Sequence, residues 1–266
     1  MGRATPQEVV LPLGVQVLAD LPLAIDPDEV LRFQGYKKGV DAPTPDVRAL
    51  FDDALAEGTR LMLPRAVVRW LPVEARGPDT LEAGGEVLTI PLTGERWGEV
   101  EYVAAAVVTI GDALERRVAA LWASRELPLA SMLDSVGSGA VESLAEYLND
   151  VLCQQGLAAG LRVTNRISPG YADWDVAEQH ALFRLCPGAP VSVTLNTACF
   201  MTPGKSISLL VGAGARARVD HYFSQCARSS TRRSRRVRAS CSRAPSFAGS
   251  RWTRAAPTPS RPAARC

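Results

Sequence analysis

The stretch from Asn165 to Asp175, NRISPGYADWD, carries the side chains of this sequence that are best suited to binding chemistry. Its Pro-Gly pair predicts a turn, because proline fixes its own φ and glycine accepts a positive φ. Arg166 before the turn offers a planar donor fork to a carboxylate. Tyr171 after it offers a π-face and a hydroxyl, and Gly170 allows close backbone approach. The pattern suits a small zwitterion with a carboxylate, a cationic centre and an aromatic base; an ordinary surface turn is the alternative.

A second pair of chemically useful residues, Glu142 and Glu146, lies four positions apart in a segment with helical periodicity. Residues four apart face the same side of a helix, so the two carboxylates would point the same way. Such a pair would suit an ammonium group or the hydroxyls of a ribose. The alternative is a solvated acidic helix face.

Three glycine-rich stretches resemble nucleotide-binding motifs and fail on spacing. Residues 203–206 (PGKS) match the end of a phosphate-binding loop, but that loop needs glycine where Cys199 stands. Residues 211–217 (VGAGARA) follow a predicted strand, yet no helix and no acidic residue follow at the required distance. Residues 137–142 (GSGAVE) have no strand leading directly into them. We therefore predict no nucleotide site of these classes.

The histidines and cysteines do not form a recognisable metal or catalytic set. The spacings His180 to Cys186 and His221 to Cys226 match no familiar zinc pattern, and two histidines give no basis for a Ser–His–Asp triad. The six cysteines include no CxxC pair and the chain is not a short secreted scaffold, which favours reduced thiols. We predict no metal site and no catalytic acid, base or nucleophile.

Length and composition indicate a globular protein with two contrasting parts. The chain has 266 residues, is 47% hydrophobic, and contains no apolar run of about 18 residues that would span a membrane. Its N-terminus lacks the pattern of a signal peptide, so a cytoplasmic location is expected. The net charge of +2 hides a tail, residues 227–266, with eleven arginines and no acidic residue. Residues 1–226 have 19 basic and 28 acidic residues, a net charge of −9.

The basic tail is predicted to be disordered. Of its 40 residues, 31 are Arg, Ser, Ala or Pro, and no hydrophobic period is present to repay the entropy of ordering. Such a tail would bind nucleic acid through its phosphates. The abrupt change after Cys226 also suits a reading-frame slip in a GC-rich gene, and we favour the slip over a nucleic-acid arm.

The pattern of apolar residues predicts an α+β fold with a largely antiparallel sheet. Strands and helices are mixed without the regular alternation of a parallel sheet. Asp26 is predicted as a helix N-cap, and Asp112 with Glu115 is predicted to form a capping box. The expected helices cover residues 26–35, 43–58, 112–127, 138–155 and 175–185, and the expected strands cover residues 85–93, 99–110, 161–167, 191–200 and 206–214, the last two as a hairpin.

Two of these segments together resemble the activation domain of vitamin B12-dependent methionine synthase. That family carries an R-x-x-P-G-Y turn, a helix, and then an L-T-E-S-x-x-M-x-P-x-x-S-x-S segment. The resemblance covers residues 100–225, while the N-terminal hundred resemble the family's free-standing members. Thr197 stands where the family has glutamate, and VESLAEYLNDVL resembles the family's helix. The matching positions are Arg166, Pro169, Gly170 and Tyr171 in the first motif, and Leu195, Met201, Pro203, Ser206 and Ser208 in the second.

The resemblance implies a C-shaped α+β domain around a twisted, largely antiparallel sheet with flanking helices. It implies that the domain binds S-adenosylmethionine and presents its methyl group to cobalamin, which a partner protein holds. By this resemblance Arg166 would hold the methionine carboxylate, and the backbone at Ser168 and Gly170 would line the adenosyl site with Tyr171. Glu142 would contact the ligand from the facing helix, and Tyr222 would correspond to a tyrosine near the end of the family's site.

The resulting functional prediction is an activation protein that supports reductive methylation of cobalamin in methionine synthase or a related corrinoid methyltransferase. Its expected partners are a cobalamin-binding module or corrinoid protein and a flavodoxin-type reductant, with no membrane. The alternatives are a non-catalytic module that docks a corrinoid protein and, less favoured, nucleic-acid binding through the tail. The predicted organisation is an N-terminal extension (1–98), the ligand-binding region (99–226) and the tail (227–266).

Overall fold

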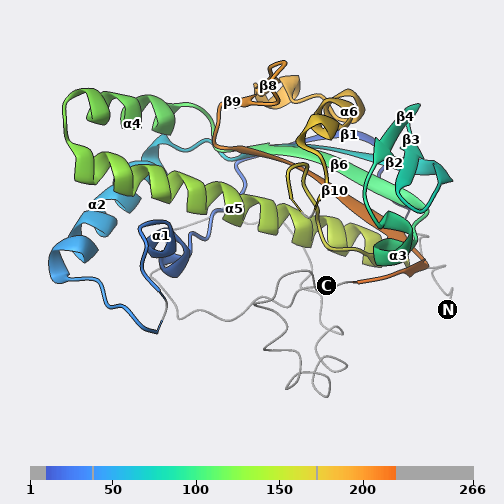
Figure 1. Ribbon diagram of the computed structural model, residues 1–266, viewed down its shortest axis with the longest axis horizontal. Helices are drawn as coiled ribbons and strands as arrows, with labels where there is room; N and C mark the ends of the chain where they lie inside the picture. Colours follow the sequence, from blue (N-terminus) through green and yellow to red (C-terminus); the bar gives the residue numbers. More distant parts are fainter. Residues whose placement is uncertain (1–9, 38, 172, 220–266) are drawn as a thin grey trace, which may run out of the picture.

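A computed structural model describes residues 10–37, 39–171 and 173–219. The predicted tail, and with it His221, Tyr222 and Cys226, lies outside the described residues. Within them the chain forms a curved, antiparallel main sheet with helices on both faces, which confirms the predicted α+β class (Figure 1). No helix in these ranges is long and apolar enough to cross a membrane.

The main sheet has the strand order β4-β3-β2-β6-β10-β7, and β1 pairs with β2 outside this path. All of these pairings are antiparallel. Two short two-stranded sheets, β11-β5 and β8-β9, lie beside it. The strands are β1 Gly14–Ala19, β2 Arg65–Arg76, β3 Thr80–Ala83, β4 Glu86–Thr89, β5 Gly98–Glu99, β6 Tyr102–Thr109, β7 Arg162–Val163, β8 Thr194–Leu195, β9 Met201–Thr202, β10 Ser206–Gly214 and β11 Arg216–Ala217.

The longest strand, β2, was not predicted from the sequence. Arg65, Arg69 and Pro72 interrupt its apolar pattern, so no regular alternation marks it. In the structure it pairs with β6 along one edge and divides its other edge between β1 and β3. A strand in this central position takes its stability from neighbours on both sides, which the local pattern does not reveal.

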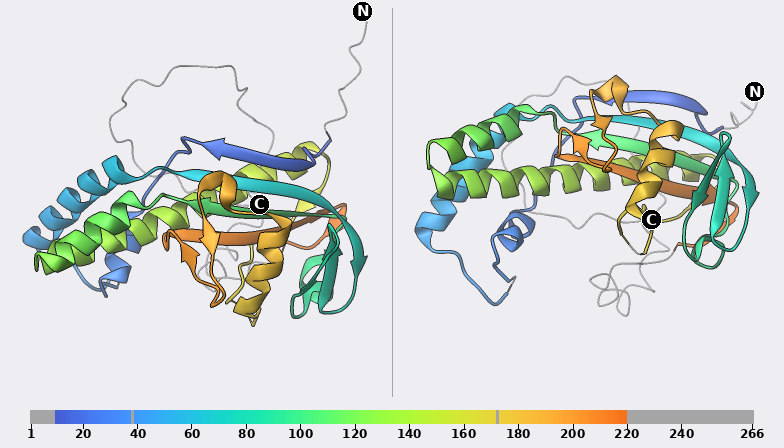
Figure 2. Two further views of the ribbon diagram at one scale, coloured as in Figure 1. Left: turned by 90° about the horizontal axis from the view of Figure 1, so that it is seen from above. Right: turned by 45° about the horizontal axis from the view of Figure 1, so that its top comes forward.

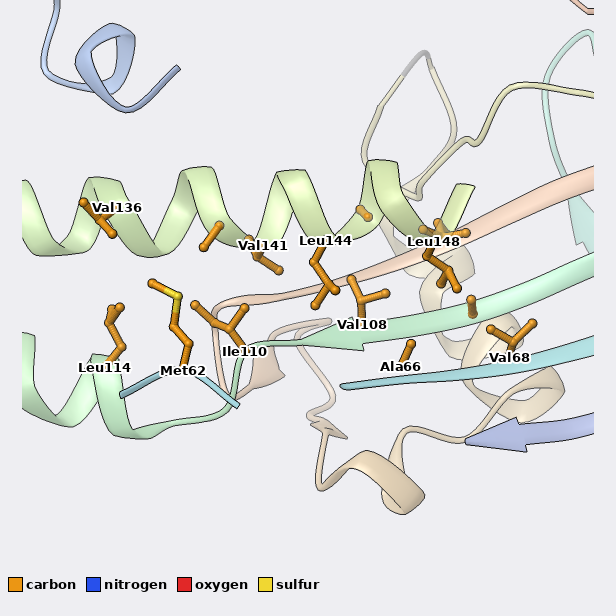
Figure 3. Close-up of a cluster of buried hydrophobic side chains, with 14 of the residues drawn as sticks. Met62, Ala66, Val68, Val108, Ile110, Leu114, Val136, Val141, Leu144 and Leu148 are labelled. Carbon is orange, nitrogen blue, oxygen red and sulfur yellow. The ribbon is translucent and has the colours of Figure 1, made fainter. Parts of the chain in front are cut away.

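Helix α5, Leu127–Ala158, crosses one face of the sheet and forms the main core with it (Figure 1). The sequence predicted only residues 138–155, because Pro128 and Gly137 in the preceding part weaken the helical pattern. Gly137 is there for packing, since a Cβ added to it would lie 2.7 Å from Leu114. Figure 3 shows the α5 side chains Val136, Val141, Leu144 and Leu148 directed at Ala66, Val68, Val108 and Ile110 of the sheet side.

Three further helices, α1 Pro27–Phe33, α2 Pro45–Leu61 and α4 Ala113–Ala123, accompany α5 on this side. Asp26 caps α1 as predicted, accepting a hydrogen bond from the backbone N–H of Asp28. The predicted capping box at α4 is wrong. The Asp112 carboxylate pairs with Arg116 instead, and Glu115 accepts a hydrogen bond at 2.5 Å from the backbone N–H of Lys205. Both carboxylates thus bind these partners and not the backbone N–H groups at the start of α4.

The opposite face of the sheet is covered by a second, smaller layer (Figure 2). It contains α3 Thr93–Trp97, α6 Gln179–Leu185 and the 3-10 turns Val176–Glu178 and Ala189–Val191. Trp97, Trp174 and Leu182 pack here against Val103, Ala105, Val107 and Leu210. The edge segment that carries Arg166 and Tyr171 runs between the two layers.

The predicted hairpin of residues 191–200 with 206–214 is wrong. Strand β10 pairs instead with β6 along eight residues and with β7 at its end. Residues 191–200 contribute only the short β8, which pairs with β9. Asn196 explains the difference, because its carboxamide oxygen accepts hydrogen bonds from the backbone of Ala198 and Phe200 and closes a local turn. Residues 85–93 likewise divide between β4 and the approach to α3.

Candidate functional site

The edge segment with the candidate residues is attached to β10 by backbone pairing. Strand β7 pairs with the end of β10, and Thr164 and Gly212 exchange hydrogen bonds of 2.8 and 2.9 Å. Ile167 and Leu210 then form an isolated antiparallel bridge. The bonds at Thr164 and the bridge at Ile167 therefore hold the segment against β10 on both sides of Arg166.

Arg166 points from this segment to helix α5 and meets both predicted glutamates. Its Nη2 donates to Glu142 Oε2 at 2.7 Å and to Glu146 Oε1 at 3.1 Å. Its Nε donates to the same Glu146 oxygen at 3.2 Å. The structure thus brings together three residues that were identified separately in the sequence. We refer to Arg166, Glu142 and Glu146 as the ion triad.

Exposure differs sharply within the ion triad. The Arg166 side chain is 13% exposed, whereas those of Glu142 and Glu146 are 43% and 32% exposed. The carboxylates therefore face solvent and the guanidinium lies beneath them. At neutral pH the triad carries one negative charge more than positive. A ligand that approaches it meets the glutamates first, so a cationic group is attracted before any carboxylate reaches Arg166.

The Pro-Gly turn follows immediately and is closed by its own backbone. Tyr171 N–H donates to the Ser168 carbonyl at 3.2 Å, and Gly170 N–H donates to the Trp174 carbonyl at 2.8 Å. Gly170 has φ +89°, a conformation that side chains rarely adopt, which accounts for glycine at this position. Ser168 is buried, and its hydroxyl has no hydrogen-bond partner among the described residues. The turn therefore contains an unused polar group next to the ion triad in sequence.

The other side of the edge segment faces an apolar cavity. Asn165 and Ile167 line it together with Tyr171, Trp174 and the α3 region around Trp97. Trp174 is 2% exposed, and its indole N–H lacks a partner in the part of the chain that the structure describes. The cavity has a volume of about 30 Å³, enough for a water, which needs roughly 10–15 Å³. An aromatic ring would enter only if the lining moved apart.

Tyr171 is the most exposed residue of this lining, at 65%. It does not contact the ion triad through any hydrogen bond within the described ranges. The five predicted site residues thus divide into three groups. Glu142 and Arg166 lie on the α5 side, Tyr171 lies on the α3 side, and Ser168 and Gly170 form the turn between them.

Sequence reasoning missed Trp174 and Trp97 as parts of this site. Trp174 belongs to the same quoted stretch, and its position three residues after Tyr171 was a usable signal, because a tryptophan in a polar loop tends to be buried. Trp97 gave no local signal. Its contact with the segment depends on α3 folding back over the sheet end.

Lys205 forms a second charged contact with α5, nearer to the start of the helix. Its ammonium pairs with Asp134 at 2.8 Å and with the Ser138 hydroxyl at 2.8 Å. Ser138 lies one turn before Glu142, so both basic residues contact one polar stripe of the helix. Among the described residues no group of His, Cys, Asp or Glu is arranged to hold a metal ion.

Comparison with known proteins gives a match in structure and none in sequence. No protein-family model matches the chain, and no curated protein matches it. A crystal structure of the MetH reactivation domain bound to AdoHcy is similar, with a TM-score of 0.60 and 18% sequence identity. The match covers 82% of this chain and 85% of that chain. At this identity the likeness establishes a shared fold.

Proposed function

We propose that this protein binds S-adenosylmethionine and acts as an activation protein for a cobalamin-dependent methionine synthase or a related corrinoid methyltransferase. The observation that carries the proposal is the ion triad beside the Ser168–Tyr171 turn, on a fold shared with a reactivation domain solved with AdoHcy. The domain division at residues 98/99 stays part of the proposal, with residues 99–226 as the ligand-binding region.

The ion triad suits the amino-acid end of S-adenosylmethionine. The ligand's ammonium and sulfonium are cations, and the exposed carboxylates of Glu142 and Glu146 would attract them. The ligand carboxylate would then share the Arg166 guanidinium, which has donors that the glutamates leave unused. In this scheme the glutamates also orient Arg166 before the ligand arrives, which lowers the entropy cost of binding.

The turn and the cavity suit the other end of the ligand. Gly170 is exposed and has no side chain, so the backbone there is open to close approach, and the buried Ser168 hydroxyl would gain a hydrogen bond that it lacks in the described residues. Tyr171 offers its ring at the mouth of the cavity. When bound, S-adenosylmethionine supplies an electrophilic methyl group. The residues of this chain bind and orient it, and none is assigned as a catalytic acid or base.

Calorimetric titration of the folded protein with S-adenosylmethionine tests the proposal. Arg166→Ala should weaken binding by about ten- to a hundredfold, because a charge-assisted hydrogen bond contributes about 1.5–3 kcal/mol. Arg166→Lys should restore only part of it, since an ammonium lacks the planar fork. Tyr171→Phe should bind better than Tyr171→Ala, because it keeps the ring.

Arg184→Ala is the matched control for Arg166→Ala. Arg184 also pairs with a glutamate, Glu86, but its side chain is 58% exposed and it lies outside the ion triad. Its variant should bind as the parent does. Failure of the folded parent to bind at millimolar ligand would refute the proposal, and equal binding by Arg166→Ala would remove the ion triad from the site.

Methyl transfer separates the proposal from its alternative, a non-catalytic module that docks a corrinoid protein. The activation protein should support methyl transfer from bound S-adenosylmethionine to reduced cobalamin on the partner. Ligand binding without any transfer would favour the docking module.

Nucleic-acid binding through residues 227–266 stays a prediction outside the described residues, and loss of salt-sensitive DNA binding on their deletion would support it.

A further inference from the structure

A separate cavity lies at the far end of the sheet, beyond α3. Its volume is about 400 Å³, within the range of small-molecule sites. It is bounded by the turn between β2 and β3, by α3, and by the β5–β11 pair. None of the residues of the ion triad lines it.

Two arginines from distant parts of the chain meet in this cavity at Gly98. Arg76 ends β2, and its Nη1 donates to the Gly98 carbonyl at 2.8 Å. Arg218 follows β11, and its Nη1 donates to the Glu95 carbonyl at 3.0 Å. A Cβ added to Gly98 would lie 3.0 Å from the Arg218 Cγ, so the aliphatic stem of Arg218 packs against this glycine. Each guanidinium is therefore anchored through one nitrogen and keeps its other N–H donors.

The charge of these two arginines is not neutralised within the described residues. No carboxylate there pairs with Arg76 or Arg218, and both bind neutral carbonyls. Glu99 also lines the cavity, but it pairs with Arg216. Asp79 and Glu101, which lie close in the chain, use their carboxylates to accept from the backbone N–H groups of Leu92 and Ala215. The charged residues of the lining are thus two arginines and one glutamate, a net charge of +1, and the glutamate is turned to Arg216.

One hydroxyl of the lining adds to the donors of the two arginines. Thr80 places its Oγ1 over Gly77, 2.5 Å from where a Cβ would lie, whereas the N–H groups of Gly77 and Gly94 already donate to the carbonyls of Thr80 and Pro78. One carboxylate has two oxygens and is satisfied by one guanidinium fork, whereas a phosphate offers more oxygens to two forks that approach from different sides. We propose that this cavity is a binding site for a phosphate-bearing small molecule, held by Arg76 and Arg218.

Calorimetric titration of the full chain with inorganic pyrophosphate tests the site. The parent should bind saturably at one site, and Arg76→Gln and Arg218→Gln should each weaken binding at least about tenfold. Arg162→Gln removes an exposed arginine from β7, outside the cavity, and should leave binding unchanged. Glu99→Gln should tighten binding, because it removes the negative charge from the lining.

Other outcomes distinguish the site from its alternatives. Succinate should bind at least about tenfold more weakly than pyrophosphate, and equal binding would overturn the assignment to phosphate.

If the two arginines serve only to anchor the end of α3, their variants will melt at lower temperature and bind pyrophosphate like the parent. That result, or absence of saturable binding by the parent at millimolar pyrophosphate, overturns the proposal. Arg76→Lys and Arg218→Lys keep the charge and should bind with intermediate affinity, even where the glutamine variants fold poorly.

Discussion

The edge segment that carries Arg166 and Trp174 has two sides, and they differ in how the hydrogen bonds and charges of their polar groups are paired. On the α5 side, Arg166 is held by two carboxylates from Glu142 and Glu146. On the α3 side, the Trp174 indole N–H is buried among apolar side chains and has no partner in the described residues. One side is charged and internally paired, and the other is apolar with one unused donor.

This difference shows how the two sides would respond to a ligand. A ligand carboxylate at the ion triad would share an arginine that two carboxylates already hold, so its net gain there is modest. A hydrogen-bond acceptor on the ligand could pair with the Trp174 indole N–H, which is buried without a partner in the described residues. Burying an unpaired donor costs about 1–3 kcal/mol. We therefore expect the ion triad to determine which ligand binds, and the apolar cavity to contribute mainly through the packing of its side chains.

The largest expected effect concerns the apolar side. Trp174→Ala should lower the free energy of unfolding by about 3–5 kcal/mol, since it removes a large buried side chain from the second layer. Trp174→Phe should recover most of this, because a ring remains and the unpaired N–H is removed. Urea denaturation measures both, with Trp122→Ala, at a 50% exposed position, as the control. A loss no larger than that of the control would show that this side is not a packed layer.

A smaller effect is expected on the charged side. Arg166→Ala should lower the free energy of unfolding by about 1–3 kcal/mol, because Glu142 and Glu146 would repel each other across a part-buried site without their shared partner. This differs from the expectation for an arginine in an open, solvated site, since only 13% of the side chain is exposed. Combining Arg166→Ala with Glu142→Gln and Glu146→Gln should restore part of the loss. No rescue by the glutamines would mean that Arg166 acts through packing alone.

Cys186 provides a pH test of the apolar layer. Burial raises the pKa of its thiol to about 12 from an ordinary value of 9.0, and the thiol lies 3.7 Å from the Val67 carbonyl. The unfolded thiol loses its proton near pH 9 while the folded one keeps it. The free energy of unfolding should therefore fall as pH rises through this range, by about 1 kcal/mol between pH 9 and 10. The slope should be smaller in Cys186→Ala, and an unchanged slope would show that the thiol is not shielded.

The smallest expected effect is at the exposed pair of Arg184 and Glu86. The hydrogen bond from Arg184 lowers the pKa of the Glu86 carboxyl, so any stabilisation is present near neutral pH and is lost on acidification. Exposed pairs contribute only roughly 0–1 kcal/mol, and salt screens them. Arg184→Ala should therefore change the urea midpoint far less than Arg166→Ala. Equal effects would remove the distinction between the buried and exposed arginines.

The α+β class, the approximate places of several elements, and the residues proposed for the site could be predicted from the sequence. Interactions between residues close in the chain were enough for these predictions. Asp26 caps α1 through a neighbour two residues away, and Gly170 is required by the positive φ of its turn. Glu142 and Glu146 face the same way because helix geometry places them one turn apart.

Only the tertiary structure decided which partners these residues take. The pairing of Arg166 with α5, the burial of Trp174 beneath α3, and the insertion of β2 between β1 and β6 all join segments far apart in the chain. The same holds for Glu115, which binds Lys205 instead of capping its own helix, and for Arg76 and Arg218 meeting at Gly98. Local propensity does not encode such contacts, because their stability arises from burial and electrostatic pairing that exist only after the layers have packed.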